Sequence, residues 1–187
     1  MLEAFLTSTL LVAIAEIGDK TQLLSIALTA RLQRPRAIIA GIFTATLFNH
    51  AIAGAAGAWV ARYLSADTMR LITACAFAAF GLWALKPDTL DEPLPTGNRS
   101  AFITTVIAFF FAEMGDKTQF ATIALGARYD AFVSVVVAGT TLGMMFANMP
   151  AVLIGQKLAN KVPAASMRRI AATLFLATAV WTLFGKH

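Results

Sequence analysis

The chain has 187 residues, of which 58% are hydrophobic and only 13% are charged. About a quarter of the residues in a soluble globular domain are charged, so this composition excludes such a domain and predicts a single domain embedded in a lipid bilayer. The net charge is +5, but the basic residues lie mostly between apolar segments and form no stripe with aromatic residues, which argues against nucleic-acid binding. With Cys75 as its one cysteine, the chain has no intramolecular disulfide.

Six apolar stretches of about 20 residues or more are predicted to be transmembrane helices. In chain order they cover residues 2–30, 37–61, 69–85, 100–127, 131–158 and 167–184. The second and fifth contain glycines that favour close approach between membrane helices: Gly41, Gly54, Gly57, Gly139, Gly143 and Gly155. Residues 87–99, between the third and fourth stretches, are rich in proline and acids and are predicted to be a flexible linker.

The two halves of the chain repeat each other. Residues 16–23 and 113–120 are identical at six of eight positions and apolar at the other two. An offset of 98 residues then aligns identical residues further along, including Gly41 with Gly139, Phe77 with Phe175 and Trp83 with Trp181. We therefore predict an all-α membrane protein with six transmembrane helices in two three-helix repeats, 1–86 and 100–187. Because three is odd, the repeats should be inverted in the membrane, a design that places substrate sites near the midplane.

The distribution of lysine and arginine residues predicts the orientation of the chain in the membrane. Outside the repeated motifs, nine of them fall on the side of the membrane that holds the linker 87–99, and four fall on the other side. Cytoplasmic loops carry the excess of basic residues. The linker is therefore expected in the cytoplasm and both termini outside it.

Each motif places two acids, a lysine, a threonine and a glutamine inside an apolar segment. Ionised groups are costly within a membrane and indicate a functional site. On a continuous helix the two acids and the lysine of one motif would share a face. We predict that the motifs face each other and form one divalent-cation site, with oxygen ligands that suit Ca²⁺, Mn²⁺ or Mg²⁺. The predicted ligands are Glu16, Asp19, Gln22, Glu113, Asp116 and Gln119.

Other residues are expected to support this site: Lys20, Lys117, Thr21, Thr118, Gly18, Gly115 and Asn148. The two glycines should either let another backbone approach closely or let the helix unwind so that carbonyls become ligands. Asn148 aligns with His50, which follows Asn49. These residues are expected either to line the pathway or relay protons, or to hydrogen-bond between helices.

The charges of the site suggest how it works. Four carboxylates and two lysines sum to −2, which one divalent cation or two protons would neutralise. This balance predicts an exchanger of one metal ion for two protons. The alternative is that Glu16 with Lys20, and Glu113 with Lys117, are simple ion pairs four residues apart on a helix.

Two copies of Glu-x-Gly-Asp-Lys-Thr in a short six-helix chain resemble a family of cation/proton exchangers. This family includes bacterial manganese exporters of the MneA type and Golgi manganese and calcium transporters. The resemblance covers essentially the whole chain. It implies export of Mn²⁺ or Ca²⁺ from the cytosol against protons, with ion binding by Glu16, Asp19, Glu113 and Asp116. It also favours the cell's inner (plasma) membrane.

We expect no enzymatic activity and no permanently bound cofactor. The expected partners are the transported ion, coupled protons and the lipid bilayer, and the chain is compatible with a homo-oligomer. One alternative function is a small exporter of amino acids, in which the same acids and lysines would bind the solute. Another is an intramembrane aspartyl protease with Asp19 and Asp116. The latter is disfavoured because the lysine after each aspartate favours ionisation of both, whereas the protease needs one shared proton.

Overall fold

The computed structural model describes residues 1–87, 100–154 and 164–184, and it is helical throughout these ranges apart from short connections. The α-helices are α1 (Leu2–Glu16), α2 (Lys20–Leu32), α3 (Pro35–Ala61), α4 (Ala66–Ala84), α5 (Ala101–Glu113), α6 (Lys117–Arg128), α7 (Val133–Ile154) and α9 (Ala164–Phe184). A short 3-10 helix, η1 (Asp130–Phe132), precedes α7. The predicted linker beyond Pro87, the predicted end of the fifth stretch and Gly155 lie outside the described residues.

The two segments that carry the motifs are broken helices. Residues 17–19 separate α1 from α2, and residues 114–116 separate α5 from α6. Gly18 and Gly115 have φ angles of 83° and 75°, in the left-handed region that glycine adopts without steric cost and that ends a right-handed helix. The prediction of one continuous helix through each motif is therefore wrong. Of the two roles expected of the glycines, local unwinding is the one that the backbone angles show, and backbone carbonyls as metal ligands stay a prediction.

The lengths of the helices bear on the predicted spans. Within the described ranges, two helical segments are by themselves long and apolar enough to cross a bilayer, Pro35–Ala61 and Asp130–Ile154. The four helices that flank the breaks have 12 to 15 residues each, fewer than the roughly 20 that a span needs. The six spans predicted from hydropathy would therefore include two that cross only as broken pairs, α1 with α2 and α5 with α6.

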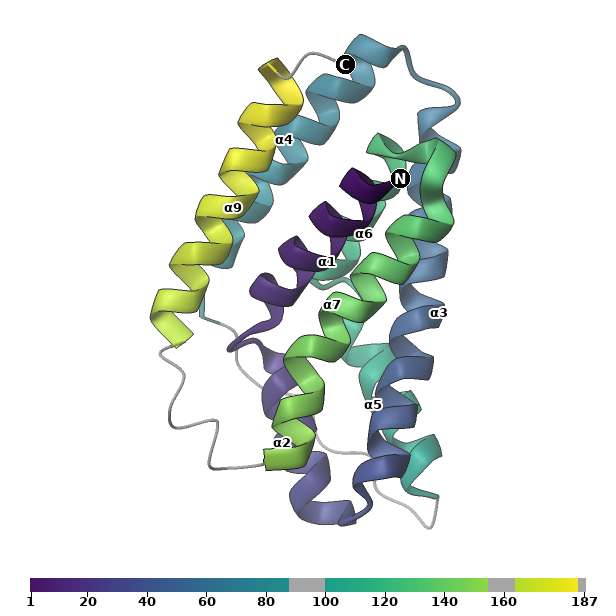
Figure 1. The fold of residues 1–187 in the computed structure, drawn as a ribbon, viewed down its shortest axis with the longest axis vertical. Helices are drawn as coiled ribbons and strands as arrows, with labels where there is room; N and C mark the ends of the chain where they lie inside the picture. The colour runs from purple at the N-terminus through teal and green to yellow at the C-terminus, as the bar shows by residue number, and fades with distance from the viewer. Residues whose placement is uncertain (88–99, 155–163, 185–187) are drawn as a thin grey trace.

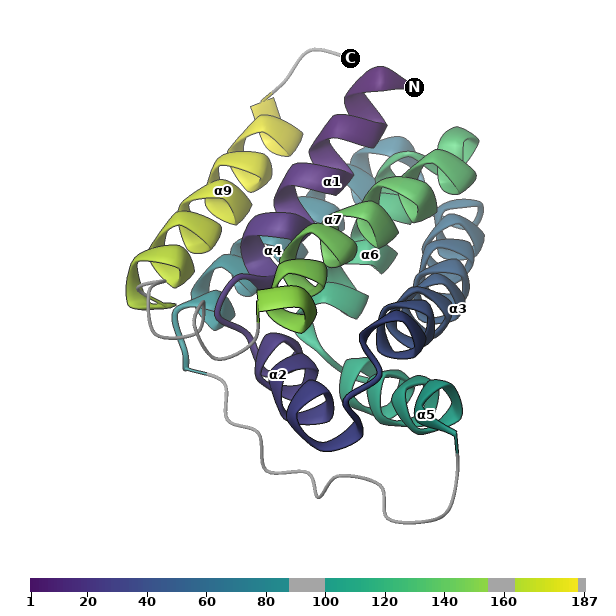
Figure 2. The ribbon, with the colours of Figure 1, turned by 60° about the horizontal axis from the view of Figure 1, so that its bottom comes forward.

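The helices form one bundle (Figures 1 and 2). At one end, which we call the terminal end, α1 begins and α9 finishes. At the other, which we call the α2–α3 end, the chain turns from α2 into α3, and α5 begins (Figure 1). The chain passes from the terminal end to the α2–α3 end through α1 and α2, and it returns in the opposite direction through α5 and α6.

The broken helices pack against the long helix of the other half of the chain. In this way α1 and α2 pack on α7, while α5 and α6 pack on α3. The remaining pair departs from this correspondence: α4 and α9 pack on each other, with α4 also on α6 and α9 also on α1. In the described part of the chain, contacts of α4 with α5 and of α9 with α2 are sparse or absent. The α4–α9 pair thus covers the halves of the broken helices that lie toward the terminal end.

Small residues allow the closest helix crossings. A Cβ on Gly57 of α3 would lie 2.0 Å from the carbonyl oxygen of Ile123 on α6, and one on Gly126 of α6 would lie 2.4 Å from that of Gly54 on α3. On α7, Gly143 is similarly close to the backbone of α1. The predicted use of glycine for close helix packing is confirmed at these crossings.

Candidate metal-binding site

The four acids of the motifs lie at the two helix breaks. Glu16 and Glu113 are the last residues of α1 and α5, and Asp19 and Asp116 are the N-caps of α2 and α6. Each aspartate accepts a hydrogen bond from a backbone N–H in the first turn of its helix, which is the usual stabilising role of an N-cap. None of the four acids is more than 3% exposed. The local sequence thus holds four carboxylates in the interior at fixed positions.

Acids from both motifs meet. Glu16, Asp19 and Asp116 each place a carboxylate oxygen within 4.8 Å of the other two; we call these residues the three-carboxylate group. Glu16 also accepts a hydrogen bond from the hydroxyl of Thr21 at 2.5 Å and another from the hydroxyl of Thr118, in the other motif. Oxygen atoms gathered at this spacing match the ligands that hard divalent cations prefer.

The two lysines pair across the motifs. Lys20 Nζ lies 3.3 Å from a carboxylate oxygen of Asp116, and Lys117 Nζ lies 2.7 Å from one of Asp19. Among the described residues, the structure does not show the alternative ion pairs within each motif, Glu16 with Lys20 and Glu113 with Lys117. The helix break between each glutamate and its lysine removes the helical turn that would bring them together. Each lysine instead holds the aspartate of the opposite motif and offsets part of its charge.

The two glutamines support the helix breaks. The side-chain oxygen of Gln22 accepts a hydrogen bond from the N–H of Gly18 at 3.0 Å, and that of Gln119 accepts one from the N–H of Gly115 at 2.8 Å. The amide nitrogen of Gln22 donates to the carbonyl of Ala147 on α7 at 3.1 Å. The amide oxygens therefore stabilise the unwound backbone in this structure, and their role as metal ligands stays a prediction.

The fourth acid, Glu113, does not belong to the three-carboxylate group. Its neighbour is His50 on α3, whose Nε2 lies 3.8 Å from the Glu113 carboxylate. Asn148, which aligns with His50 in the repeat, accepts a hydrogen bond from the hydroxyl of Ser25 at 2.8 Å and so joins α7 to α2. The sequence predicted a role for His50 in the pathway or between helices but did not pair it with Glu113. Its place beside an acid of the second motif depends on how α3 packs against α5.

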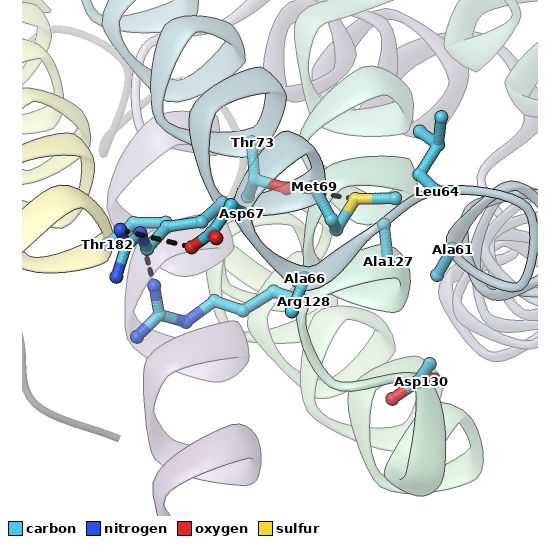
Figure 3. Close-up of a pocket in the computed structure, with 11 residues that line it drawn as sticks. Ala61, Leu64, Ala66, Asp67, Met69, Thr73, Ala127, Arg128, Asp130 and Thr182 are labelled. Carbon is cyan, nitrogen blue, oxygen red and sulfur yellow. Dashed lines mark hydrogen bonds and ion pairs between the residues drawn. The ribbon is translucent and has the colours of Figure 1, made fainter.

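A pocket of about 400 Å³ lies away from the motifs, near the terminal end (Figure 3). It is lined mainly by α4, by the ends of α3 and α6 and by the connection from α3 to α4, with Asp130 of η1 and Thr182 of α9. Here the buried Arg128 donates a hydrogen bond to the hydroxyl of Thr182 on α9 and lies 3.8 Å from a carboxylate oxygen of Glu3 on α1. Burial raises the pKa of the neighbouring Tyr129, whose hydroxyl donates a hydrogen bond to a carboxylate oxygen of Glu3 at 2.9 Å. These contacts tie three helices together: α1, α6 and α9.

An apolar, all-helical bundle whose buried acids and lysines meet at paired helix breaks defines a polytopic membrane protein of the transporter class. The family model described as "Divalent cation/proton antiporter GDT1" matches residues 4–92 and 101–187. The chain belongs to this family of cation transporters and is not an enzyme. The family resemblance predicted from the doubled motif is thereby confirmed.

Several relatives are similar over nearly the whole chain. A protein of Vibrio cholerae named "Putative manganese exporter" is 50% identical over 173 residues, which cover 92% of this chain and 86% of the relative. A GDT1-like protein of Synechocystis is 28% identical over 210 residues, covering 97% and 98%. GDT1-like protein 4 of rice is 26% identical over 211 residues, covering 98% and 74%. No solved structure matches the chain.

Proposed function

We propose that this protein exports divalent cations from the cytosol in exchange for protons, with Mn²⁺ as the main substrate and Ca²⁺ as a second one. The observation that carries the proposal is the three-carboxylate group, in which acids from both motifs meet in the interior of the bundle. Buried carboxylates need a compensating charge, and a divalent cation supplies it. The name of the Vibrio cholerae relative supports manganese as the substrate.

The charge of the site supports exchange. The four motif acids and the two lysines that pair with the aspartates sum to −2. One divalent cation or two protons would bring this sum to zero, and a neutral site crosses between the two faces of a membrane at the least electrostatic cost. The proposed stoichiometry is therefore two protons for each metal ion.

The packing of α4 and α9 supports alternating access between two inverted repeats. Each broken helix packs on the long helix of the other half of the chain, although α6 packs on α3 far more extensively than α2 packs on α7. The α4–α9 pair is less symmetric still, because it lies on α6 and α1 and the described residues show at most sparse contacts to α5 and α2. In the described structure the site is thus covered more closely from the terminal end. The opposite state would place α9 on α2 and α4 on α5, and so expose the ion to the other side.

The proposed location is the inner (plasma) membrane, with both termini outside the cytoplasm. The α2–α3 turn carries Arg31, Arg34 and Arg36, and it lies at the end of the bundle opposite the start of α1 (Figure 1). Basic residues favour the cytoplasmic side. The described structure, covered at the terminal end, would then be open toward the cytoplasm.

Transport into proteoliposomes tests the function. Purified protein is reconstituted with a metal-sensitive dye inside the vesicles, and Mn²⁺ is added outside after a pH gradient has been imposed. We expect Mn²⁺ uptake that requires acid inside and moves two protons for each ion without net charge. Asp19→Asn or Asp116→Asn should lower the rate by about a hundredfold, because each removes a charge from the three-carboxylate group.

Asp67→Asn is the matched control, since Asp67 is an exposed acid of α4 that pairs with Arg70. This variant should transport at the wild-type rate. Uptake of lysine by the same vesicles would favour the amino-acid exporter instead. Wild-type vesicles that move neither Mn²⁺ nor Ca²⁺, or aspartate variants that keep full activity, would contradict the proposal.

A further inference from the structure

His50 and Glu113 form a buried polar pair that the three-carboxylate group does not use. Both side chains are fully buried. Within the described residues, neither ring nitrogen of His50 and neither carboxylate oxygen of Glu113 has a hydrogen-bond partner. Buried polar groups are costly unless they are satisfied. This pair is therefore arranged for something other than the packing of α3 against α5.

The equivalent residues in the other half of the chain are satisfied by protein atoms. Glu16, which aligns with Glu113, accepts hydrogen bonds from two threonine hydroxyls. Asn148, which aligns with His50, accepts one from Ser25. The residue that aligns with Ser25 is Thr122, and its hydroxyl donates to the backbone of its own helix instead. The hydrogen bonding of the two halves therefore differs at the His50 position, where the first repeat carries an imidazole and the second carries the amide of Asn148.

The distance between the two side chains fits shared coordination. His50 Nε2 and Glu113 Oε2 are 3.8 Å apart, which is too far for a hydrogen bond. Two ligands on one metal ion, with bonds of about 2.1 Å, lie up to about 4 Å apart. The break that ends at Asp116 begins right after Glu113, so an ion held by this pair would lie next to the three-carboxylate group.

We propose that His50 and Glu113 form a second cation position in the transport path, in which His50 Nε2 binds the metal directly and favours Mn²⁺ over Ca²⁺ and Mg²⁺. Ca²⁺ and Mg²⁺ take oxygen ligands, whereas a neutral imidazole adds affinity for first-row transition-metal ions. The three-carboxylate group offers oxygen only and discriminates poorly among these ions. This inference rests on the proposed function in taking Mn²⁺ as a transported ion.

Pulsed electron paramagnetic resonance of bound Mn²⁺ tests the inference directly. The protein is purified without a histidine tag and loaded with up to two equivalents of Mn²⁺ in detergent. A coordinated imidazole gives a ¹⁴N coupling in the Mn²⁺ spectrum, whereas oxygen ligands give none. The chain has two histidines, His50 and His187. We expect the coupling in the wild-type protein and in His187→Ala, and its loss in His50→Asn.

The substitution His50→Asn introduces the residue that the second repeat carries at the same position, and His50→Gln provides a second variant of different length. Both should elute as the wild-type protein does on size exclusion. Because the wild-type spectrum is informative by itself, a variant that fails to fold leaves the test intact. A wild-type spectrum without ¹⁴N coupling, or a coupling that persists in folded His50→Asn, would overturn the proposal.

Competition in the transport assay provides the functional readout. In His50→Asn, the KM for Mn²⁺ should rise about tenfold while that for Ca²⁺ changes less than about twofold, so that Ca²⁺ inhibits Mn²⁺ uptake more strongly. An unchanged Mn²⁺/Ca²⁺ preference would also overturn the inference. If the preference were unchanged but Asp19→Asn still abolished uptake, the proposed function would stand and only the second cation position would be rejected. If wild-type vesicles moved no metal, the proposed function itself would fail.

Discussion

Lys20 and Lys117 occupy the same position in the two motifs but differ in environment. Lys117 is 3% exposed and lies 2.7 Å from Asp19, whereas the side chain of Lys20 is 23% exposed and lies 3.3 Å from Asp116. A buried ion pair that loses one partner leaves a charge without compensation, whereas a partly exposed pair loses little. The two lysine–aspartate pairs are therefore alike in sequence but should contribute differently to the stability of the folded protein.

This difference gives a prediction for paired substitutions. Lys117→Gln should lower the free energy of unfolding by about 3 kcal/mol, and the matched Lys20→Gln by about 1 kcal/mol or less. A cation bound at the three-carboxylate group would replace the lost charge, so saturating Mn²⁺ should restore more stability to Lys117→Gln than it adds to the wild-type protein. Thermal unfolding in detergent, followed by tryptophan fluorescence with and without Mn²⁺, measures both effects. Equal destabilisation by the two substitutions would contradict this account.

At the scale of the helices, two uses of glycine shape the molecule. Gly18 and Gly115 end a helix through their backbone angles, whereas Gly57 and Gly126 let α3 and α6 cross closely through the absence of a side chain. The first use creates the breaks that hold the acids. The second fixes α6 against α3, and with it the position of Asp116 at the start of α6.

Adding one methyl group at the α3–α6 crossing tests this packing. In Gly57→Ala the new Cβ would meet the backbone of Ile123 at 2.0 Å, and a backbone cannot rotate away as a side chain can. We expect a loss of about 2 kcal/mol in stability, together with reduced transport as α6 shifts. Ala56→Leu, at the exposed neighbouring position, adds more volume and should be nearly neutral. A stable, fully active Gly57→Ala protein would show that the crossing tolerates more separation than the structure indicates.

At the scale of the whole molecule, the α4–α9 pair is the part that breaks the correspondence between the halves. It packs on α6 and α1, and the Arg128 contacts with Glu3 and Thr182 reinforce this side. If transport requires this pair to move between the two ends of the broken helices, joining it to α6 should stop the cycle.

Cross-linking tests that movement. Thr73 of α4 and Ala127 of α6 line the same pocket, and the exposed Cys75 is first replaced by alanine. Joining Thr73→Cys to Ala127→Cys with a short, reducible bifunctional thiol reagent should lower Mn²⁺ transport at least about tenfold, and reduction should restore it. Each single-cysteine protein treated with the same reagent is the control. Undiminished transport by the cross-linked protein would show that α4 and α6 stay together throughout the cycle.

Much of this architecture was predictable from the residues in order. The doubled motif indicated the transporter family, and the glycines of α3 indicated close packing. The apolar stretches without a motif indicated helices close to their observed bounds within the described residues. These features depend on local composition and spacing, which are the same in every conformation of the chain. The two motif glycines could also be identified from the sequence as possible points of unwinding, although each motif was predicted to lie within one continuous helix.

The pairing of the site depended on tertiary structure. In sequence, Lys20 has an equally good partner in Glu16, one helical turn away, and nothing local favours Asp116, which is 96 positions further along the chain. The breaks at Gly18 and Gly115 remove the local option, and packing of each broken helix on the long helix of the other half supplies the distant one. The same packing puts His50 beside Glu113 and Asn148 beside Ser25. These two aligned residues therefore have different kinds of neighbour, which the alignment of the repeats did not predict. The sequence by itself determined which charged and polar groups lie within the apolar stretches. Only the packing of the helices decided which of them meet, because ion pairs and hydrogen bonds form between groups that are close in space.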